Sequence, residues 1–145
     1  MSIKTCMSKV VRIVSPVQTI CEAARTMKTI DAGFLPVGEN DRLVGTITDR
    51  DITVRAVAEG QGPDTPVRDV MTKGLHYCFE DDDIETVAEQ MAQLQVRRLP
   101  VLNHGKRVVG IVSLSDICRT GAYNAELSAA TLSSVTTPGG QHVQK

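Results

Sequence analysis

Apolar residues recur every three or four positions in two segments of this chain, the spacing that predicts one buried face on an α-helix. Thr19 stands directly before the first segment as a helix cap, and we expect that helix to end near Thr29, because Gly33 follows. The second helix is expected after the acidic residues 80–83, whose carboxylates would complement the positive end of its dipole. The apolar positions correspond one to one: Ile20, Ala23, Ala24, Met27 and Ile30 in the first helix, and Ile84, Val87, Ala88, Met91 and Leu94 in the second.

Runs of β-branched and apolar residues between polar turns predict strands around both helices. The expected strands cover residues 10–14, 34–37 and 43–48 in the first half of the chain, and 77–79, 99–102 and 108–112 in the second. A polar turn would join the last two strands of each half into a hairpin. A further helix is expected from Asp49 to about Glu59, with Gly60 as its left-handed stop, and another is expected from Ser115.

A glycine-initiated motif occurs twice, at the end of the last expected strand of each half. The two copies are Gly45-Thr46-Ile47-Thr48-Asp49-Arg50-Asp51 and Gly110-Ile111-Val112-Ser113-Leu114-Ser115-Asp116. A hydroxyl residue followed three positions later by a carboxylate is the capping-box pattern, in which both side chains satisfy amides of the first helical turn. Such a junction can also present amides and a positive dipole end to an anion, and a carboxylate can accept from both hydroxyls of a ribose. One copy alone would favour a plain helix cap, whereas two copies favour a duplicated ligand site.

The duplication extends beyond the glycine motifs. Met7-Ser8-Lys9 recurs as Met71-Thr72-Lys73, and Leu35-Pro36-Val37 recurs as Leu99-Pro100-Val101. The chain is therefore interpreted as a tandem repeat of a unit of roughly sixty residues. A unit of that size buries only a marginal core, so we expect the two repeats to share one.

These motifs together resemble the cystathionine β-synthase (CBS) domain, and two in tandem resemble a CBS pair, or Bateman module. The segments Thr-Asp-Arg-Asp-Ile (48–52) and Val-Arg-Arg-Leu-Pro-Val (96–101) resemble small stand-alone bacterial members of the hypoxic response protein type. The resemblance covers about residues 5–120 and implies an α/β (α+β) fold of tandem βαββα repeats, packed as a pseudo-two-fold pair through their sheets. We expect repeat 1 over residues 5–60, repeat 2 over 67–121, and a flexible C-terminal tail over 133–145.

Composition excludes several classes of function for the 145 residues. A net charge of −1 argues against a nucleic-acid binder, and 3% aromatic residues leave little for stacking bases. No apolar run approaches the length of a membrane span, and the N-terminus lacks the apolar core of a signal peptide, so a cytoplasmic protein without a membrane partner is expected. The four cysteines lack zinc-site spacing, and no histidine pairs by spacing with Ser or Cys, so neither a metal site nor an enzyme is expected.

The resemblance implies a set of ligand contacts. Asp51 and Asp116 would take the ribose hydroxyls of an adenosyl nucleotide, with Thr48 and Ser113 beside them. The apolar walls of the base would come from Leu35, Pro36, Leu99 and Pro100. Ser15, before the proline that ends the first expected strand, is either a ligand contact or a turn hydroxyl.

The charged positions differ between the repeats. Arg97 lies three residues before Pro100, where the CBS family often places a basic residue against phosphate, but its counterpart three residues before Pro36 is Gly33. Arg50 lies inside the first motif, whereas its counterpart is Ser115. This asymmetry argues against two equivalent sites, and a solvated surface charge remains the alternative for Arg97.

Two functions follow as hypotheses. The first is a regulatory module that senses AMP, ADP, ATP or a related adenosyl ligand in clefts between the repeats. The second is a ligand-free interaction module, in which the motifs are only caps and a flat dimer docks an unidentified protein. In both cases we expect a homodimer, because one pair would leave apolar helix faces uncovered at Ile20, Ala24 and Met27 and at Val87, Ala88 and Met91.

Overall fold

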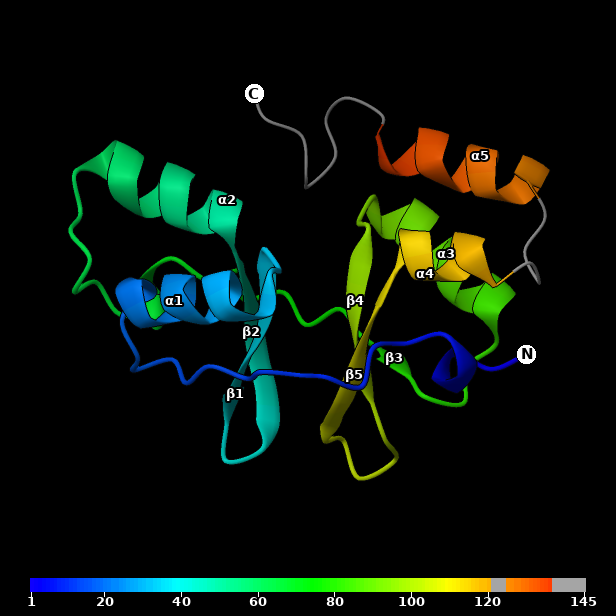
Figure 1. Cartoon of the computed structure of the whole chain (residues 1–145), viewed down its shortest axis with the longest axis horizontal. Helices are drawn as coiled ribbons and strands as arrows, with labels where there is room; N and C mark the ends of the chain where they lie inside the picture. The colour runs from blue at the N-terminus through cyan, green and yellow to red at the C-terminus, as the bar shows by residue number, and fades with distance from the viewer. Residues whose placement is uncertain (121–124, 137–145) are drawn as a thin grey trace. The chain divides into compact units, whose positions relative to one another are not determined.

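The computed structural model describes residues 1–120 and 125–136, which divide into two compact units (Figure 1). The N-terminal unit comprises residues 11–75 with 106–108, and the C-terminal unit comprises residues 1–10 and 76–105 together with the described residues from 109 onward. The units therefore differ from the sequence repeats at one end. Residues 1–10 pack with the second repeat, and residues 67–75, their counterpart, pack with the first.

The N-terminal unit is a hairpin covered by one amphipathic helix. Helix α1 (Ile20–Ile30) begins where Thr19 accepts a hydrogen bond from the Glu22 amide (3.1 Å), and it ends at Asp31 in the left-handed conformation. Strands β1 (Phe34–Glu39) and β2 (Arg42–Thr48) pair antiparallel. Asn40 and Asp41 both have positive φ, which matches a primed two-residue turn and confirms the predicted hairpin.

The helix after β2 has the predicted extent but three types of helical turn. It runs through α2 (Asp49–Asp51), the π-helical η2 (Ile52–Ala56) and the 3₁₀-helical η3 (Val57–Glu59), and stops at Gly60 with φ of 75°. The connector then forms the short 3₁₀ helix η4 (Val67–Asp69).

The strand predicted over residues 10–14 is wrong except at its last residue. Val14 forms a single parallel bridge to Val37, with the Val14 amide donating to the Pro36 carbonyl (3.1 Å). Val10 and Ile13 are 72% and 45% exposed. The β-branched residues of this segment favour an extended backbone, but only Val14 lies beside a strand with which it can pair.

The C-terminal unit repeats this plan and adds elements. The sheet has the order β3 (Cys78–Phe79), β4 (Arg98–Leu102), β5 (Val108–Ser113), with β3 parallel to β4. Its helices are η1 (Ile3–Thr5), α3 (Ile84–Leu94), α4 (Leu114–Arg119) and α5 (Ala125–Val135). Helix α4 starts one residue earlier than predicted, because Ser113 is its cap.

The apolar faces of α1 and α3 are buried inside their own units. Ile20 and Met27 belong to the core of the N-terminal unit, and Val87, Ala88 and Met91 belong to the core of the C-terminal unit. Among the residues expected to lie uncovered, only Ala24 is exposed. The predicted reason for dimerisation is therefore wrong, because periodicity identifies a buried face without identifying what covers it.

The predicted tail over residues 133–145 begins too early. Helix α5 continues to Val135, whose side chain is fully buried in the core of the C-terminal unit. The Ser134 hydroxyl donates to the Ala92 carbonyl of α3 (3.3 Å), and the Gln95 side chain donates to the Ser134 carbonyl (3.2 Å). The buried Val135 and these two hydrogen bonds therefore hold residues 133–135 in a helix, although their sequence is largely polar. The rest of the predicted tail, residues 137–145, lies outside the described residues.

None of the described helices is both long and apolar enough to cross a membrane.

Candidate functional site

Both glycine motifs form complete capping boxes. In the first, the Thr48 amide donates to Asp51 Oδ2 and the Asp51 amide donates to Thr48 Oγ1, both at 3.0 Å. In the second, the Ser113 amide donates to Asp116 Oδ2 at 2.9 Å and the Asp116 amide donates to Ser113 Oγ at 3.0 Å. The predicted caps are confirmed, and each carboxylate commits one oxygen to its own helix.

The glycine that opens each motif lies against a second backbone segment. A Cβ on Gly45 would come 2.6 Å from the Thr72 carbonyl oxygen, and a Cβ on Gly110 would come 2.8 Å from the Ser8 carbonyl oxygen. Beside these glycines, Thr46 exchanges two backbone hydrogen bonds with Thr72 (3.0 and 2.8 Å), and Ile111 does the same with Ser8. The lead-in sequences that repeat along the chain are thus the partners that require glycine.

The second oxygen of each carboxylate has a different environment in the two motifs. Asp51 Oδ1 lies 3.7 Å from Arg55 Nε and within 3.5 Å of the Thr72 hydroxyl, and the Asp51 side chain is 11% exposed. Asp116 Oδ1 accepts from Arg119 (3.4 Å), and the Asp116 side chain is 22% exposed. A ribose would reach Asp116 more readily than Asp51.

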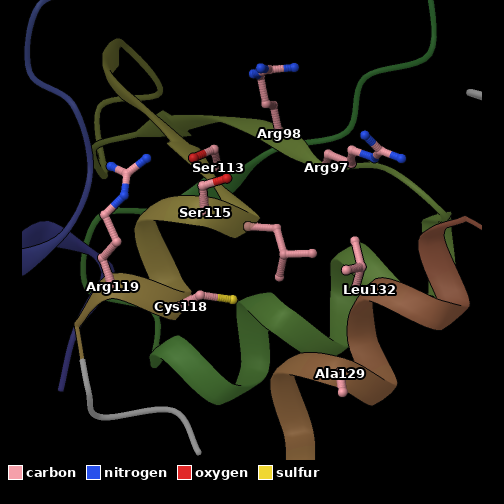
Figure 2. A pocket seen from close by; sticks show the side chains of 9 residues that line it. Arg97, Arg98, Ser113, Ser115, Cys118, Arg119, Ala129 and Leu132 are labelled. Atoms are coloured by element: carbon pink, nitrogen blue, oxygen red, sulfur yellow. The ribbon is translucent and has the colours of Figure 1, made fainter. Parts of the chain in front are cut away.

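A pocket of about 530 Å³ lies in the C-terminal unit, beside the second motif (Figure 2). The entry to β4, the end of β5 and helix α4 provide most of its lining, and α5 provides the rest. The lining residues are Arg97, Arg98, Ser113, Leu114, Ser115, Cys118, Arg119, Ala129 and Leu132. Its volume is in the range of small-molecule sites.

The pocket is basic, since three of its described lining residues are arginines and none of these described residues is a carboxylate. Arg119 is paired with Asp116, but neither Arg97 nor Arg98 is paired with a carboxylate anywhere in the part of the chain that the structure describes. Both arginines are exposed, and the Arg97 carbonyl is held by the Leu114 amide at 2.8 Å. Two guanidinium groups without a counter-ion are suited to a phosphate or carboxylate.

The first repeat has an acidic residue at the corresponding place. The Asp49 amide donates to the Gly33 carbonyl (3.0 Å), as the Leu114 amide does to that of Arg97, so Gly33 and Arg97 occupy equivalent backbone positions. A Cβ on Gly33 would collide with the Asp49 carboxylate. Arg50, inside the first motif, is half-buried. The asymmetry noted in the sequence is therefore also electrostatic.

The remaining predicted contacts have structural roles. Leu35 and Leu99 belong to the cores of their units, and Pro36 and Pro100 are buried as well, so their function as base walls stays a prediction. The Ser15 hydroxyl accepts from the Val17 amide (3.3 Å), the contact of a turn residue.

Other titratable groups lie apart from the pocket. Burial, with Asp82 and Cys6 nearby, raises the pKa of Cys78 to about 12, which leaves its thiol unreactive. The hydrogen bond between His104 and Asp81 (2.7 Å) raises the pKa of the histidine and lowers that of the carboxyl. No group of three potential metal ligands occurs among residues 1–120 and 125–136.

Of the nine residues that line the pocket, the sequence predicted only Arg97 and Ser113 as ligand contacts. It missed Arg98, Leu114 and Ser115, and also Cys118, Arg119, Ala129 and Leu132. Cys118 and Arg119 could have been found, because Ser115, Cys118 and Arg119 share one face of a helix that starts after Ser113. The two residues of α5 could not be found in this way, since the apolar residues of that helix show weak periodicity.

Two units with the same strand–helix motif define a tandem repeat protein, and a basic pocket lies beside the second motif. Residues 3–57 and 67–122 match the family described as "CBS domain", and the chain belongs to that family, with two repeats of the βαββα type.

Stand-alone CBS proteins are among the relatives. The chain is 40% identical over 129 residues to "CBS domain-containing protein YhcV" from Bacillus subtilis, covering 89% of this chain and 91% of that protein. It is 38% identical over 104 residues to "Hypoxic response protein 1" from Mycobacterium tuberculosis, covering 70% and 72% respectively.

Solved structures agree with these relatives. A crystal structure of hypoxic response protein I with two coordinated zinc ions superposes with a TM-score of 0.75 at 34% identity, covering 83% of this chain and 98% of that one. The CBS pair of protein MJ0100, in complex with 5'-methylthioadenosine and S-adenosyl-L-methionine, gives a TM-score of 0.74 at 30% identity, covering 82% and 94%.

Proposed function

We propose that this chain is a non-catalytic regulatory module that binds an adenosyl nucleotide such as AMP, ADP or ATP. The observation that carries the proposal is the basic pocket, whose lining includes Arg97, Arg98 and Ser113, the partner of Asp116 in the second capping box. The adenosyl ligands of the MJ0100 pair support the class of ligand.

In the proposed site, residues of the second repeat would bind the phosphate end of the ligand. The free lone pairs of Asp116 would accept from the ribose hydroxyls, and Arg97 would donate to the phosphate. In the first repeat, Asp49 beside Gly33 would repel a phosphate. We therefore propose that one phosphate-bearing ligand binds per chain.

The alternative is the interaction module without a ligand. It is favoured by the completeness of the capping boxes, which explain Asp51 and Asp116 without any ribose. A homodimer remains part of both proposals, and the exposed Val54 and Val57 on the helix after β2 offer apolar surface for it. Light scattering at micromolar concentration checks this assembly: a monomer would refute it.

A thermal-shift panel of AMP, ADP, ATP, NAD and S-adenosylmethionine separates the two functions. A ligand at a hundred times its Kd adds about 2.7 kcal/mol to the free energy of unfolding, so a melting temperature raised by roughly 5–10 °C is expected for at least one. If all five leave the melting temperature unchanged, the interaction module is the better account.

A further inference from the structure

Helix α5 contributes one wall of the basic pocket. Ala129 and Leu132 line it from this helix, opposite the residues of β4, β5 and α4 (Figure 2). Leu132 is 47% exposed, whereas Thr131 beside it is 5% exposed and Val135 is fully buried. An apolar side chain of α5 thus borders the space beside two arginines for which the described residues supply no carboxylate partner.

The helix depends on docking for its stability. It has only eleven residues, a length at which an isolated helix is marginal in water. The last turn of α5 packs on the C-terminal unit through Val135, which lies in the core. Ser134 in the same turn is hydrogen-bonded to Ala92 of α3 and to Gln95, which follows α3. A molecule that fills the pocket would add contacts to Leu132 and Ala129, and so would stabilise the docked helix.

We propose that α5 is part of the ligand site, and that the phosphate-bearing ligand and the docked C-terminal helix stabilise each other. This inference rests on the proposed function and names how that site is regulated. The coupling free energy between two linked events is reciprocal. A change that weakens the packing of α5 must therefore lower the affinity for the ligand, and bound ligand must stabilise α5 against undocking.

Leu132→Glu in the full-length chain tests this arrangement. The introduced carboxylate would lie in the pocket and compete with the phosphate for Arg97 and Arg98, so the affinity for AMP should fall by about tenfold. Adenosine has no phosphate, and its affinity should change less than twofold. The matched control is Ala130→Glu, which places the same charge at an exposed position on the same helix outside the pocket lining, and which should bind AMP like the wild type.

Hydrogen exchange of the wild type gives a second readout that needs no variant. Saturating AMP should slow exchange of the amides over residues 129–136 by about tenfold, and equimolar adenosine should do less. Equal AMP affinity in Leu132→Glu and Ala130→Glu, together with unchanged exchange in α5, would overturn the role of α5 while leaving nucleotide binding intact. A wild type that binds no AMP would overturn the proposed function itself, and the inference with it.

Discussion

Gly45→Ala is expected to destabilise the N-terminal unit because of the second backbone segment that lies against the glycine. The added Cβ would be 2.6 Å from the Thr72 carbonyl oxygen, well inside van der Waals contact, and that oxygen belongs to backbone that cannot rotate away. Relieving the overlap must stretch or break the two hydrogen bonds between Thr46 and Thr72, at 3.0 and 2.8 Å. Each such bond contributes about 0.5–1.5 kcal/mol to the free energy of unfolding, so loss of both would lower it by about 1–3 kcal/mol.

Part of that loss is offset because alanine restricts the unfolded chain by about 0.4–1 kcal/mol relative to glycine. The net cost is about 1–2 kcal/mol, which corresponds to a melting temperature lowered by roughly 2–8 °C. Gly62→Ala is the matched control, because nothing lies within 4 Å of its added Cβ. Urea and thermal unfolding of both variants measure the difference. Equal stability of the two would refute the explanation that close approach of the lead-in segment requires the motif glycine.

Two further predictions concern charged groups. Asp116→Asn keeps a side-chain acceptor for the Ser113 amide, so it should change the free energy of unfolding by less than about 1 kcal/mol. It should nevertheless reduce the AMP thermal shift, and an unchanged shift would remove Asp116 from the ribose site. His104 has a raised pKa, so its pair with Asp81 stabilises the fold fully below the ordinary value of 6.5, and this contribution is lost as pH rises through the raised folded pKa. NMR titration should show the His104 pKa falling in Asp81→Asn, and no change would exclude that contact in solution.

Local sequence patterns predicted the parts of the fold that depend on local contacts. The capping boxes of Thr48–Asp51 and Ser113–Asp116 join residues three positions apart, and both were predicted correctly. The contact between Gly45 and Thr72 was not predicted, although both residues were noted as repeat landmarks, because no local pattern tells which distant segment pairs with a strand.

Long-range packing also explains the failures. Met27 and Met91 were recognised as buried-face residues but were assigned to a dimer, because the pattern does not show that their own sheets cover them. Leu132 was not predicted to line the pocket, because the described contacts of its helix, the buried Val135 and the hydrogen bond from Ser134 to Ala92, leave no periodic pattern in the sequence. Arg97 was proposed from the resemblance to CBS domains, by its position three residues before Pro100; it does line the pocket, and its role in phosphate binding stays a prediction.

Titration calorimetry of AMP and of adenosine against the wild type and Arg97→Ala tests the central claim most directly. If the Arg97 guanidinium meets the phosphate, its loss removes a charge-assisted hydrogen bond worth about 1.5–3 kcal/mol. AMP should then bind about ten to a hundred times more weakly to Arg97→Ala, whereas adenosine should bind nearly as it does to the wild type. Raised salt should weaken AMP binding more in the wild type than in the variant, because an exposed ion pair is screened. Equal losses for both ligands would mean that Arg97 only shapes the pocket, and no loss for either would contradict its role in phosphate binding.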